Sequence, residues 1–280
     1  MKELKIICDS LADIPKYLVN KYDIEVVPLT IRIDEVDYKD GINISNKDFY
    51  EKIKSIYEVP KTSQATYVQF SEIFNKYIDE NKDILYISGS SKVTGTLQSA
   101  TMAKKDIEGN IYLFDSFNLS YGCGAQVVKA CEMREEGFDV DDIIKKLERI
   151  QEDILVLFEV DSLEYLLKGG RITKSKAVVG NMLNIKPVLS MEDGEIKELI
   201  KIRGKKHVIS KIIEIIKKKF DNNLSNKEIT VANGDNYKDM LRLKEAIEKE
   251  FNVKVSEAEI GPSIGSHTGP GTIGVCISQK

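Results

Sequence analysis

The sequence predicts a two-domain α/β protein, in which a mainly parallel sheet flanked by helices is followed by a second α/β domain with a mixed or mostly antiparallel sheet. Its 280 residues exceed the usual length of one domain. Up to about residue 150, short apolar runs alternate with amphipathic helical patterns, which is typical of a parallel sheet; hairpin and helical patterns mix after that point. No low-complexity linker separates the halves. We therefore expect domains at 1–152 and 153–280 that pack around a cleft.

In the first half, strand patterns lead into polar loops and then into helices. The predicted strands are short apolar runs at 4–8, 24–33, 83–88 and 110–116, with a hairpin return at 36–41. The predicted helices lie at 15–22, 46–57, 67–80, 95–107 and, as a pair, within 122–150. Asp13 and Ser45 are expected to cap the helices that follow them. Because ligands of parallel sheets bind where strands end and helices begin, the loops between them are candidate sites.

In the second half, the pattern changes to strands, hairpins and helices in mixed order. Strand patterns lie at 154–160, 228–233, 253–260 and 272–278, and residues 187–199 predict a hairpin that turns at Asp193-Gly194. Helical patterns lie at 162–170, 174–183, 205–219 and 237–250. This mixture indicates a sheet that is not purely parallel.

The composition is that of an ordinary globular protein, and it excludes several classes. There are 41 basic and 45 acidic residues, so the formal net charge of −4 provides no long-range attraction to nucleic acid or to anionic membrane. The N-terminus lacks the apolar stretch of a secretory signal, and no window approaches the ~18 apolar residues of a membrane span. The four cysteines are scattered, which favours buried thiols over a zinc site. We expect a cytoplasmic protein without a metal or a cofactor.

Two polar loops carry candidate ligand-binding residues. The loop at 88–96 has five hydroxyl side chains and two glycines, and it leads into a helix whose first amides and dipole favour an anion. It lacks the spacing of a P-loop, and a simple N-capping turn is the alternative. The loop at 60–66 contains the adjacent hydroxyls of Thr62 and Ser63, which could also be a helix cap.

The segment at 261–274 places His267 among glycines, prolines and hydroxyl residues. Glycine lets a backbone approach a ligand closely and proline stiffens a loop, so the pattern indicates a polar loop that positions the imidazole. The alternative is a turn-rich connection with His267 in solvent. The letters GPSIG at 261–265 also match the nucleophile elbow of hydrolases, but that motif requires a helix after the turn. Because a loop and a strand are expected here, we interpret the match as chance.

Two further segments cluster basic residues. Arg171 follows paired glycines and could line a cleft. Arg203, Lys205 and Lys206 are expected to form a surface patch, with His207 exposed beside them. This patch is a candidate docking surface.

Six segments occur in an order that identifies a family resemblance: DSLADI at 9–14, KTSQAT at 61–66, ISGSSKVTGTLQSA at 87–100, LEYLLKGGRI at 163–172, LNIKPVLSMEDGEI at 183–196 and IGPSIGSHTGPGTIGV at 260–275. Together they resemble the DegV family of fatty-acid-binding proteins, which includes the binding subunits of bacterial fatty acid kinase. The resemblance covers essentially the whole chain. It implies an α/β domain with a parallel sheet followed by a second α/β domain with a mostly antiparallel one.

The resemblance also implies a ligand and a site. The ligand would be a long-chain fatty acid such as palmitate, with its tail in an apolar tunnel and its carboxyl group at the domain junction. Matched residue by residue, the carboxyl-binding positions are Thr62, Ser63, Thr94, Gly95 and His267. Position 94 is threonine where the family usually has serine. Arg203 falls where binding subunits engage the catalytic subunit of the kinase, which implies a non-catalytic role in acyl-phosphate formation and phospholipid metabolism.

The implied chemistry is consistent with the residue types, although two other classes stay open. Burial of an acyl tail contributes ~0.8 kcal/mol per CH₂, so neutral hydroxyls and an amide suffice to hold the head group. A charge-assisted hydrogen bond from His267 would then steady an acyl phosphate. A hydrolase or acyltransferase would instead use Thr94 or Ser63 with His267, but no acidic residue is placed to orient the imidazole. A binder of a small polar ligand would have a short polar pocket in place of the tunnel.

Overall fold

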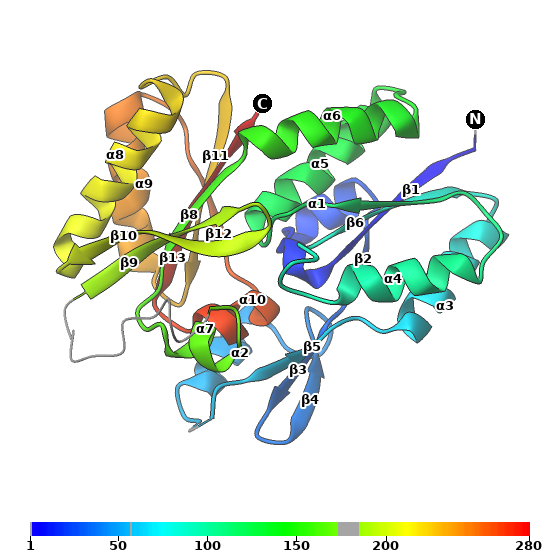
Figure 1. Cartoon of the computed structure of the whole chain (residues 1–280), viewed down its shortest axis with the longest axis horizontal. Helices are drawn as coiled ribbons and strands as arrows, with labels where there is room; N and C mark the ends of the chain where they lie inside the picture. The colour runs from blue at the N-terminus through cyan, green and yellow to red at the C-terminus, as the bar shows by residue number, and fades with distance from the viewer. Residues whose placement is uncertain (1, 57, 173–184) are drawn as a thin grey trace.

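The computed structural model describes residues 2–56, 58–172 and 185–280. Figure 1 shows two main sheets side by side and a small three-stranded sheet beneath them. One main sheet is parallel and the other is mixed, so the predicted fold class is confirmed. The predicted helix at 174–183 lies outside the described residues. No helix in the described ranges combines the length and the apolar character needed to cross a bilayer.

The first main sheet is parallel throughout, as predicted. Its strands are, in sheet order, β2 (Glu25–Val27), β1 (Leu4–Asp9), β6 (Asp83–Ser88) and β7 (Ile111–Asp115). Its helices are α1 (Lys16–Lys21), α3 (Tyr67–Asp79), α4 (Thr96–Lys105), α5 (Tyr121–Glu135) and α6 (Val140–Asp153). Apolar side chains of α5 and α6 pack on one face, and those of α3 and α4 pack on the other. Both faces of the strands are therefore buried, which explains their continuous apolar runs.

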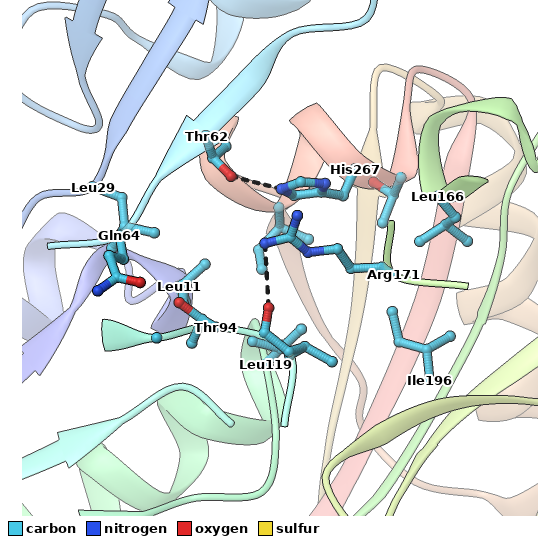
Figure 2. Close-up of a pocket in the computed structure, with 14 residues that line it drawn as sticks. Leu11, Leu29, Thr62, Gln64, Thr94, Leu119, Leu166, Arg171, Ile196 and His267 are labelled. Atoms are coloured by element: carbon cyan, nitrogen blue, oxygen red, sulfur yellow. Dashed lines mark hydrogen bonds between the residues drawn. The ribbon is translucent and has the colours of Figure 1, made fainter. Parts of the chain in front are cut away.

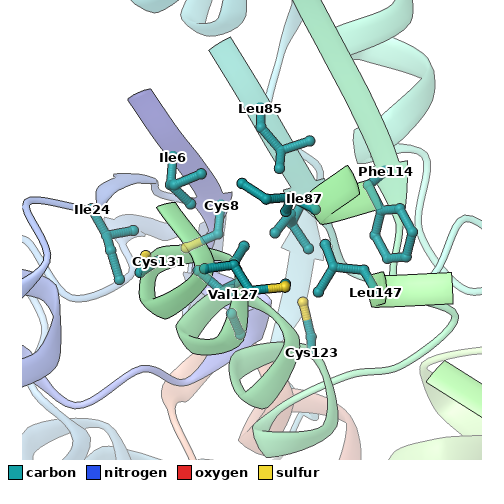
Figure 3. Close-up of a cluster of buried hydrophobic side chains, with 14 of the residues drawn as sticks. Ile6, Cys8, Ile24, Leu85, Ile87, Phe114, Cys123, Val127, Cys131 and Leu147 are labelled. Carbon is teal, nitrogen blue, oxygen red and sulfur yellow. The ribbon is translucent and has the colours of Figure 1, made fainter. Parts of the chain in front are cut away.

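The core under α5 contains all four cysteines, with Cys276 of β13 (Thr272–Gln279) at its edge toward the second sheet. Cys8 of β1 packs there with Cys123 and Cys131 of α5 and with Leu147 of α6, as Figure 3 shows. All four cysteines of the chain are buried free thiols. Burial raises the pKa of Cys8, Cys123 and Cys131 because a low-dielectric core disfavours the thiolate. These thiols are therefore packing groups.

The prediction of one continuous strand at 24–33 is wrong, because two strands in different sheets cover this range. The chain leaves the parallel sheet after β2 and forms a separate antiparallel sheet in the order β4 (Val36–Lys39), β3 (Thr30–Ile33), β5 (Lys61–Ser63). Pro28 lies between β2 and β3 and has no N–H for a sheet ladder, so continuous pairing breaks there. The predicted hairpin return at 36–41 is confirmed in β4, whereas the predicted polar connection at 60–66 includes strand β5. The helix α2 (Asn46–Ile53) connects β4 to β5 and begins, as predicted, with the side chain of Ser45 as its cap.

The second main sheet is mixed. Its strands are, in sheet order, β10 (Glu195–Arg203), β9 (Ile185–Glu192), β8 (Leu155–Glu159), β13 (Thr272–Gln279), β11 (Lys227–Gly234) and β12 (Ser256–Glu259). Only the β11–β12 pair is parallel. Its helices α8 (Val208–Phe220) and α9 (Tyr237–Phe251) bury one face. The predicted hairpin turn is confirmed, since Asp193 and Gly194 both have positive φ angles (53° and 79°) between β9 and β10.

The segment after β12 forms a helix, α10 (Pro262–Thr268), where a loop was predicted. Pro262 occupies the first turn, where its missing N–H leaves no hydrogen bond unmade. Gly269 ends the helix with a φ of 75°, which glycine adopts without a Cβ clash. The helix was missed because glycines and hydroxyl residues have low helix propensity, and tertiary packing overrides that preference here. Its residues are buried except for His267, which is half-buried.

Two carboxylates from the first half of the chain hold the start of α10. Asp13 accepts a hydrogen bond from the Gly261 amide at 3.0 Å, and Asp40 accepts one from the Ser263 amide at 3.1 Å. The prediction that Asp13 caps the helix after it is therefore wrong, because α1 has no side-chain cap. The Asp13 carboxylate instead accepts hydrogen bonds from the Ser120 hydroxyl and the Gly261 amide. These contacts fix α10 against the first half of the molecule.

Candidate functional site between the sheets

A pocket of about 140 Å³ lies where β5, the loop before α4, and α10 meet α7 (Glu164–Lys168) and its following loop. Half of its lining residues are apolar; we call it the polar pocket because the side chains of Thr62, Gln64, Thr94, Arg171 and His267 gather in it. Figure 2 shows its lining side chains pointing toward a common space. The lining residues are Leu11, Leu29, Thr62, Gln64, Val93, Thr94, Gly95, Leu119, Leu166, Arg171, Ile196, Ile264, His267 and Thr268. The wall thus combines segments from both main sheets and from the small one.

The pocket wall contains a hydrogen bond between Thr62 and His267. The Thr62 hydroxyl oxygen lies 2.7 Å from His267 Nε2, and either atom can be the donor because the tautomer decides their roles. Burial, with a smaller contribution from the charge of Arg171, lowers the pKa of His267 to about 3. The imidazole is therefore neutral at pH 7. The expected charge-assisted bond from His267 is not supported, and Arg171 is the cation beside it.

The opposite wall is the turn from β6 into α4. Gly95 is the N-cap residue that precedes α4. A Cβ atom at this position would collide with the side-chain oxygen of Gln64. Gln64 is held over the glycine by its amide, which donates to the Ser99 hydroxyl at 2.8 Å. The hydroxyl of Thr94 lies 2.9 Å from that of Thr96. A side chain at position 95 would therefore displace the Gln64 amide from this position.

Arg171 brings a positive charge into the pocket. Its guanidinium donates to the Gly169 carbonyl at 2.6 Å and to the Val93 carbonyl at 3.2 Å, the latter drawn in Figure 2. Burial lowers its pKa, but a guanidinium stays protonated at neutral pH. The neutral donors expected for the head group therefore share their pocket with one cation. The cleft-lining position suggested for Arg171 by its paired glycines is confirmed.

On its outer side, the pocket continues into a wider space of about 560 Å³. Thr62, Arg171 and His267 line both, and the outer space adds the exposed side chains of Lys61 and Lys168. Glu58 also lines the outer space, and Lys61 and Lys168 pair with Glu58 and Glu164, so the mouth of the site carries charges of both signs.

On its inner side, the pocket meets an apolar cavity of about 70 Å³ behind the second sheet's inner face. Four residues line both spaces: Leu119, Ile196, Ile264 and Thr268. Alternate residues of three adjacent strands line one side of the cavity. They are Val156 and Phe158 of β8, Thr230 and Ala232 of β11, and Thr272, Gly274 and Cys276 of β13. Small side chains in the centre of this face leave room that large ones would fill.

The structure brings together most, but not all, of the residues proposed for the head-group site. Thr62, Thr94, Gly95 and His267 line the polar pocket, whereas Ser63 is exposed and does not. The expectation for Ser63 is wrong because β5 is a strand, in which adjacent side chains point to opposite faces. Gln64, two residues after Thr62, lines the pocket in place of Ser63. The alternation of side-chain direction along a strand could have identified Gln64 from the sequence.

Arg203 and His207 lie away from the pocket. Arg203 is the last residue of β10 and is exposed, and the exposure predicted for His207 is confirmed. Among the residues with defined placement, no group of three or more His, Cys, Asp or Glu side chains could hold a metal ion.

The segment at 261–265 has the strand–turn–helix form of a nucleophile elbow, contrary to the prediction of a loop. Ser263 is nevertheless fully buried, and its hydroxyl lies 3.4 Å from that of Ser10. It does not line the pocket that contains His267. Within the described ranges, His267 Nδ1 has no hydrogen-bond partner, so no carboxylate orients the ring. The match to the elbow therefore stays a coincidence, and a Thr94–His267 or Ser63–His267 catalytic pair is not formed.

The polar pocket lies beside an apolar cavity, and the molecule contains a parallel and a mixed sheet. These features define an α/β protein with a candidate site for an amphipathic ligand. The family model that matches the chain describes uncharacterised proteins of the DegV family, and the match covers residues 3–280. The chain belongs to the DegV family, and the resemblance found from its six motifs is confirmed.

Curated relatives and solved structures match this chain over essentially its whole length. A fatty acid-binding protein of Thermotoga maritima is 34% identical over 98% of this chain and 97% of its own. A fatty-acid-binding DegV family protein from Thermus thermophilus has a TM-score of 0.91 at 28% identity, with full coverage of both chains. A stearic acid-binding protein from Eubacterium ventriosum has a TM-score of 0.92 at 27% identity, covering 99% of this chain and 98% of its own.

Proposed function

We propose that this chain binds a long-chain fatty acid, with the carboxyl group in the polar pocket and the tail in the apolar cavity. The observation that supports this proposal is that the two spaces are adjacent and share four lining residues. An amphipathic ligand with one polar end and one apolar end is complementary to such a site. The relatives and solved structures described as fatty-acid-binding support the same ligand class.

The tail provides most of the affinity. Each buried CH₂ contributes ~0.8 kcal/mol, so a palmitoyl tail of about fifteen such groups would contribute ~12 kcal/mol before the cost of association is subtracted. The cavity of about 70 Å³ must widen by side-chain movement to admit such a tail. The pocket then needs only to orient the carboxylate and to satisfy its oxygens. Thr62, Thr94 and the Gly95 amide are the donors proposed for this role, with the charge of Arg171 close by.

His267 orients the Thr62 donor in this proposal. A neutral imidazole carries a proton on one nitrogen. If Nε2 carries it and donates to the Thr62 hydroxyl oxygen, the Thr62 hydroxyl proton is free to point into the pocket and to donate to a carboxylate. The low pKa of His267 supports this arrangement, since it keeps the ring uncharged at neutral pH.

We further propose that the chain presents the carboxyl group to the catalytic subunit of a fatty acid kinase and catalyses nothing by itself. The outer space lies on the carboxyl side of the pocket, so a second protein could reach the carboxylate but not the tail. The exposed Arg203 is the proposed contact with that subunit. Such a pair would supply acyl phosphate for phospholipid synthesis in the cytoplasm. The site would lie at the junction of domains 1–152 and 153–280.

A chain-length series tests the fatty-acid proposal. Delipidated protein should bind saturated acids of eight to sixteen carbons with affinities that rise about threefold to fourfold per CH₂ until the cavity is filled. Calorimetry measures this, and mass spectrometry of an organic-solvent extract identifies the acid that copurifies. Equal affinity for acetate and palmitate would instead indicate a small polar ligand in the outer part of the site and would overturn the proposal.

A further inference from the structure

The hydroxyl of Thr96 is paired with that of Thr94 at the turn into α4. The two hydroxyl oxygens lie 2.9 Å apart, and the Thr96 amide also donates to the Thr94 oxygen at 3.3 Å. Thr96 is the first residue of α4 and is fully buried, whereas Thr94 lines the polar pocket. Thr96 is not among the described residues that line the pocket, the outer space or the apolar cavity. It can therefore act on a ligand only through another residue.

The Thr94 oxygen is an acceptor in this turn. A hydroxyl group has one proton to donate and two lone pairs that accept. One lone pair of the Thr94 oxygen accepts from the Thr96 amide. The bond between the two hydroxyls has two possible directions, because either oxygen can be the donor. If the Thr96 hydroxyl donates, both lone pairs of the Thr94 oxygen are used and its proton is the part that stays free.

A carboxylate distinguishes between these two directions, because an ionised carboxylate accepts hydrogen bonds and donates none. If Thr94 donated to Thr96, the Thr94 oxygen could offer the carboxylate only a lone pair, and the two groups would repel each other. If Thr96 donates to Thr94, the Thr94 proton is available to the carboxylate. Within the described part of the chain, the Thr94 hydroxyl is the one hydrogen-bond partner of the Thr96 hydroxyl. No second acceptor there competes for the Thr96 proton.

We propose that Thr96 is a positioning residue of the head-group site, whose hydroxyl donates to Thr94 and so directs the Thr94 proton to a carboxylate oxygen of the bound fatty acid. This inference rests on the proposed fatty-acid function. On the opposite wall, Nε2 of His267 has the same role toward the Thr62 hydroxyl in that proposal. In both pairs, a neighbouring donor occupies the oxygen of a threonine and frees its proton. Linked hydrogen bonds also polarise one another, which strengthens the donor that faces the ligand.

The test compares Thr96→Val with Thr96→Ser in delipidated protein. Valine keeps the shape of threonine and removes the hydroxyl, whereas serine keeps the hydroxyl. Palmitate affinity, measured by calorimetry, should fall roughly threefold to tenfold in the valine variant, because the Thr94 hydroxyl loses its fixed direction, and should stay within about twofold of wild type in the serine variant. Thr96→Ala also lacks the hydroxyl and suits the first turn of a helix, so it should show the same loss as valine.

A double-mutant cycle with Thr94→Val separates positioning from a general effect on the fold. The tail provides most of the affinity, so Thr94→Val should still bind palmitate measurably. In that background there is no Thr94 hydroxyl to direct, so adding Thr96→Val should change palmitate affinity by less than about twofold. A residue that only supports the fold would instead lower the affinity equally in both backgrounds, and that result would overturn the proposal.

Thr101→Val is the matched control. Thr101 lies on the same helix, but its hydroxyl donates to the Leu97 carbonyl at 2.8 Å. This variant should keep the palmitate affinity of the wild type. Unchanged affinity in Thr96→Val, or a serine variant as weak as the valine variant, would reject the role of Thr96. A wild-type protein that binds no fatty acid would overturn the underlying function instead, so the two failures are distinguishable.

Discussion

The hydroxyl oxygen of Thr62 lies 2.7 Å from Nε2 of His267, although 205 positions separate the two residues. This bond links strand β5 of the small sheet to helix α10, which precedes the central strand β13 of the second sheet. The two side chains also line both the polar pocket and the outer space. Any change that moves α10 relative to β5 therefore changes the proposed head-group site.

Removing the Thr62 hydroxyl should weaken both the fold and the site. In Thr62→Val, a half-buried imidazole nitrogen loses its partner, so the free energy of unfolding should fall by about 1–3 kcal/mol. Palmitate affinity should fall as well, since a donor is lost. Urea unfolding and calorimetry measure the two effects. Thr62→Ser is the control and should be close to wild type in both; a serine variant as defective as the valine variant would contradict the role of the hydroxyl.

The low pKa of His267 predicts a definite pH dependence of stability. The pKa is about 3 in the folded protein, compared with about 6.5 in an unfolded chain. Between these values the unfolded chain binds more protons, so the contribution of His267 to the unfolding free energy is complete above pH ~6.5. It is lost as the pH falls, by up to about 1.4 kcal/mol per unit.

Urea unfolding at several pH values from 4 to 7.5 checks this slope. His267→Gln carries a side chain that does not titrate, and its unfolding free energy should depend less steeply on pH over this range. Parallel curves for the variant and the wild type would show that the imidazole is not held in its neutral form.

A methyl group at position 95 should displace Gln64. In Gly95→Ala the new Cβ collides with the Gln64 side-chain oxygen, although the backbone angles of Gly95 (φ −87°, ψ 6°) suit alanine. We expect palmitate affinity to fall roughly tenfold, which corresponds to ~1.4 kcal/mol. The double variant Gly95→Ala with Gln64→Ala removes the collision. If the double variant binds no better than Gly95→Ala, the collision is not the cause.

Asp40 should be required for the placement of α10. It is 6% exposed and accepts from the Ser263 amide, and burial raises its pKa. Asp40→Ala leaves that amide unpaired and should lower the free energy of unfolding by about 1–3 kcal/mol. Asp40→Asn keeps a carbonyl acceptor and should lose less. Urea unfolding of both variants checks the order, and the reverse order would contradict it.

Arg203 should affect the partner and not the fatty acid. It is exposed at the end of β10 and lies outside all three spaces of the site. Arg203→Ala should bind palmitate within about twofold of wild type, while association with a fatty acid kinase catalytic subunit, measured by biolayer interferometry, should be lost. Lys201→Ala on the same strand is the control. Normal association of Arg203→Ala would reject this residue as the contact.

Local patterns were sufficient for most of the elements. The capping serine at position 45, the apolar run of β6 and the turn at Asp193-Gly194 each depend on neighbouring residues alone, and each is present as predicted. Helix α10 was missed because its stability comes from burial and from distant carboxylates, such as Asp40, which a local pattern does not include.

The amino-acid sequence alone determined the family and the mixed α/β class, because motifs, periodicity and caps are properties of short segments. Of the five carboxyl-binding residues that the resemblance implied, four line the pocket. The side of β5 that faces the pocket, the exposure of Ser63 and the bonds from Arg171 to the Gly169 and Val93 carbonyls came only from the folded chain. Each of these depends on contacts between segments that are far apart in sequence. Such contacts form only when the two sheets and α10 are packed together.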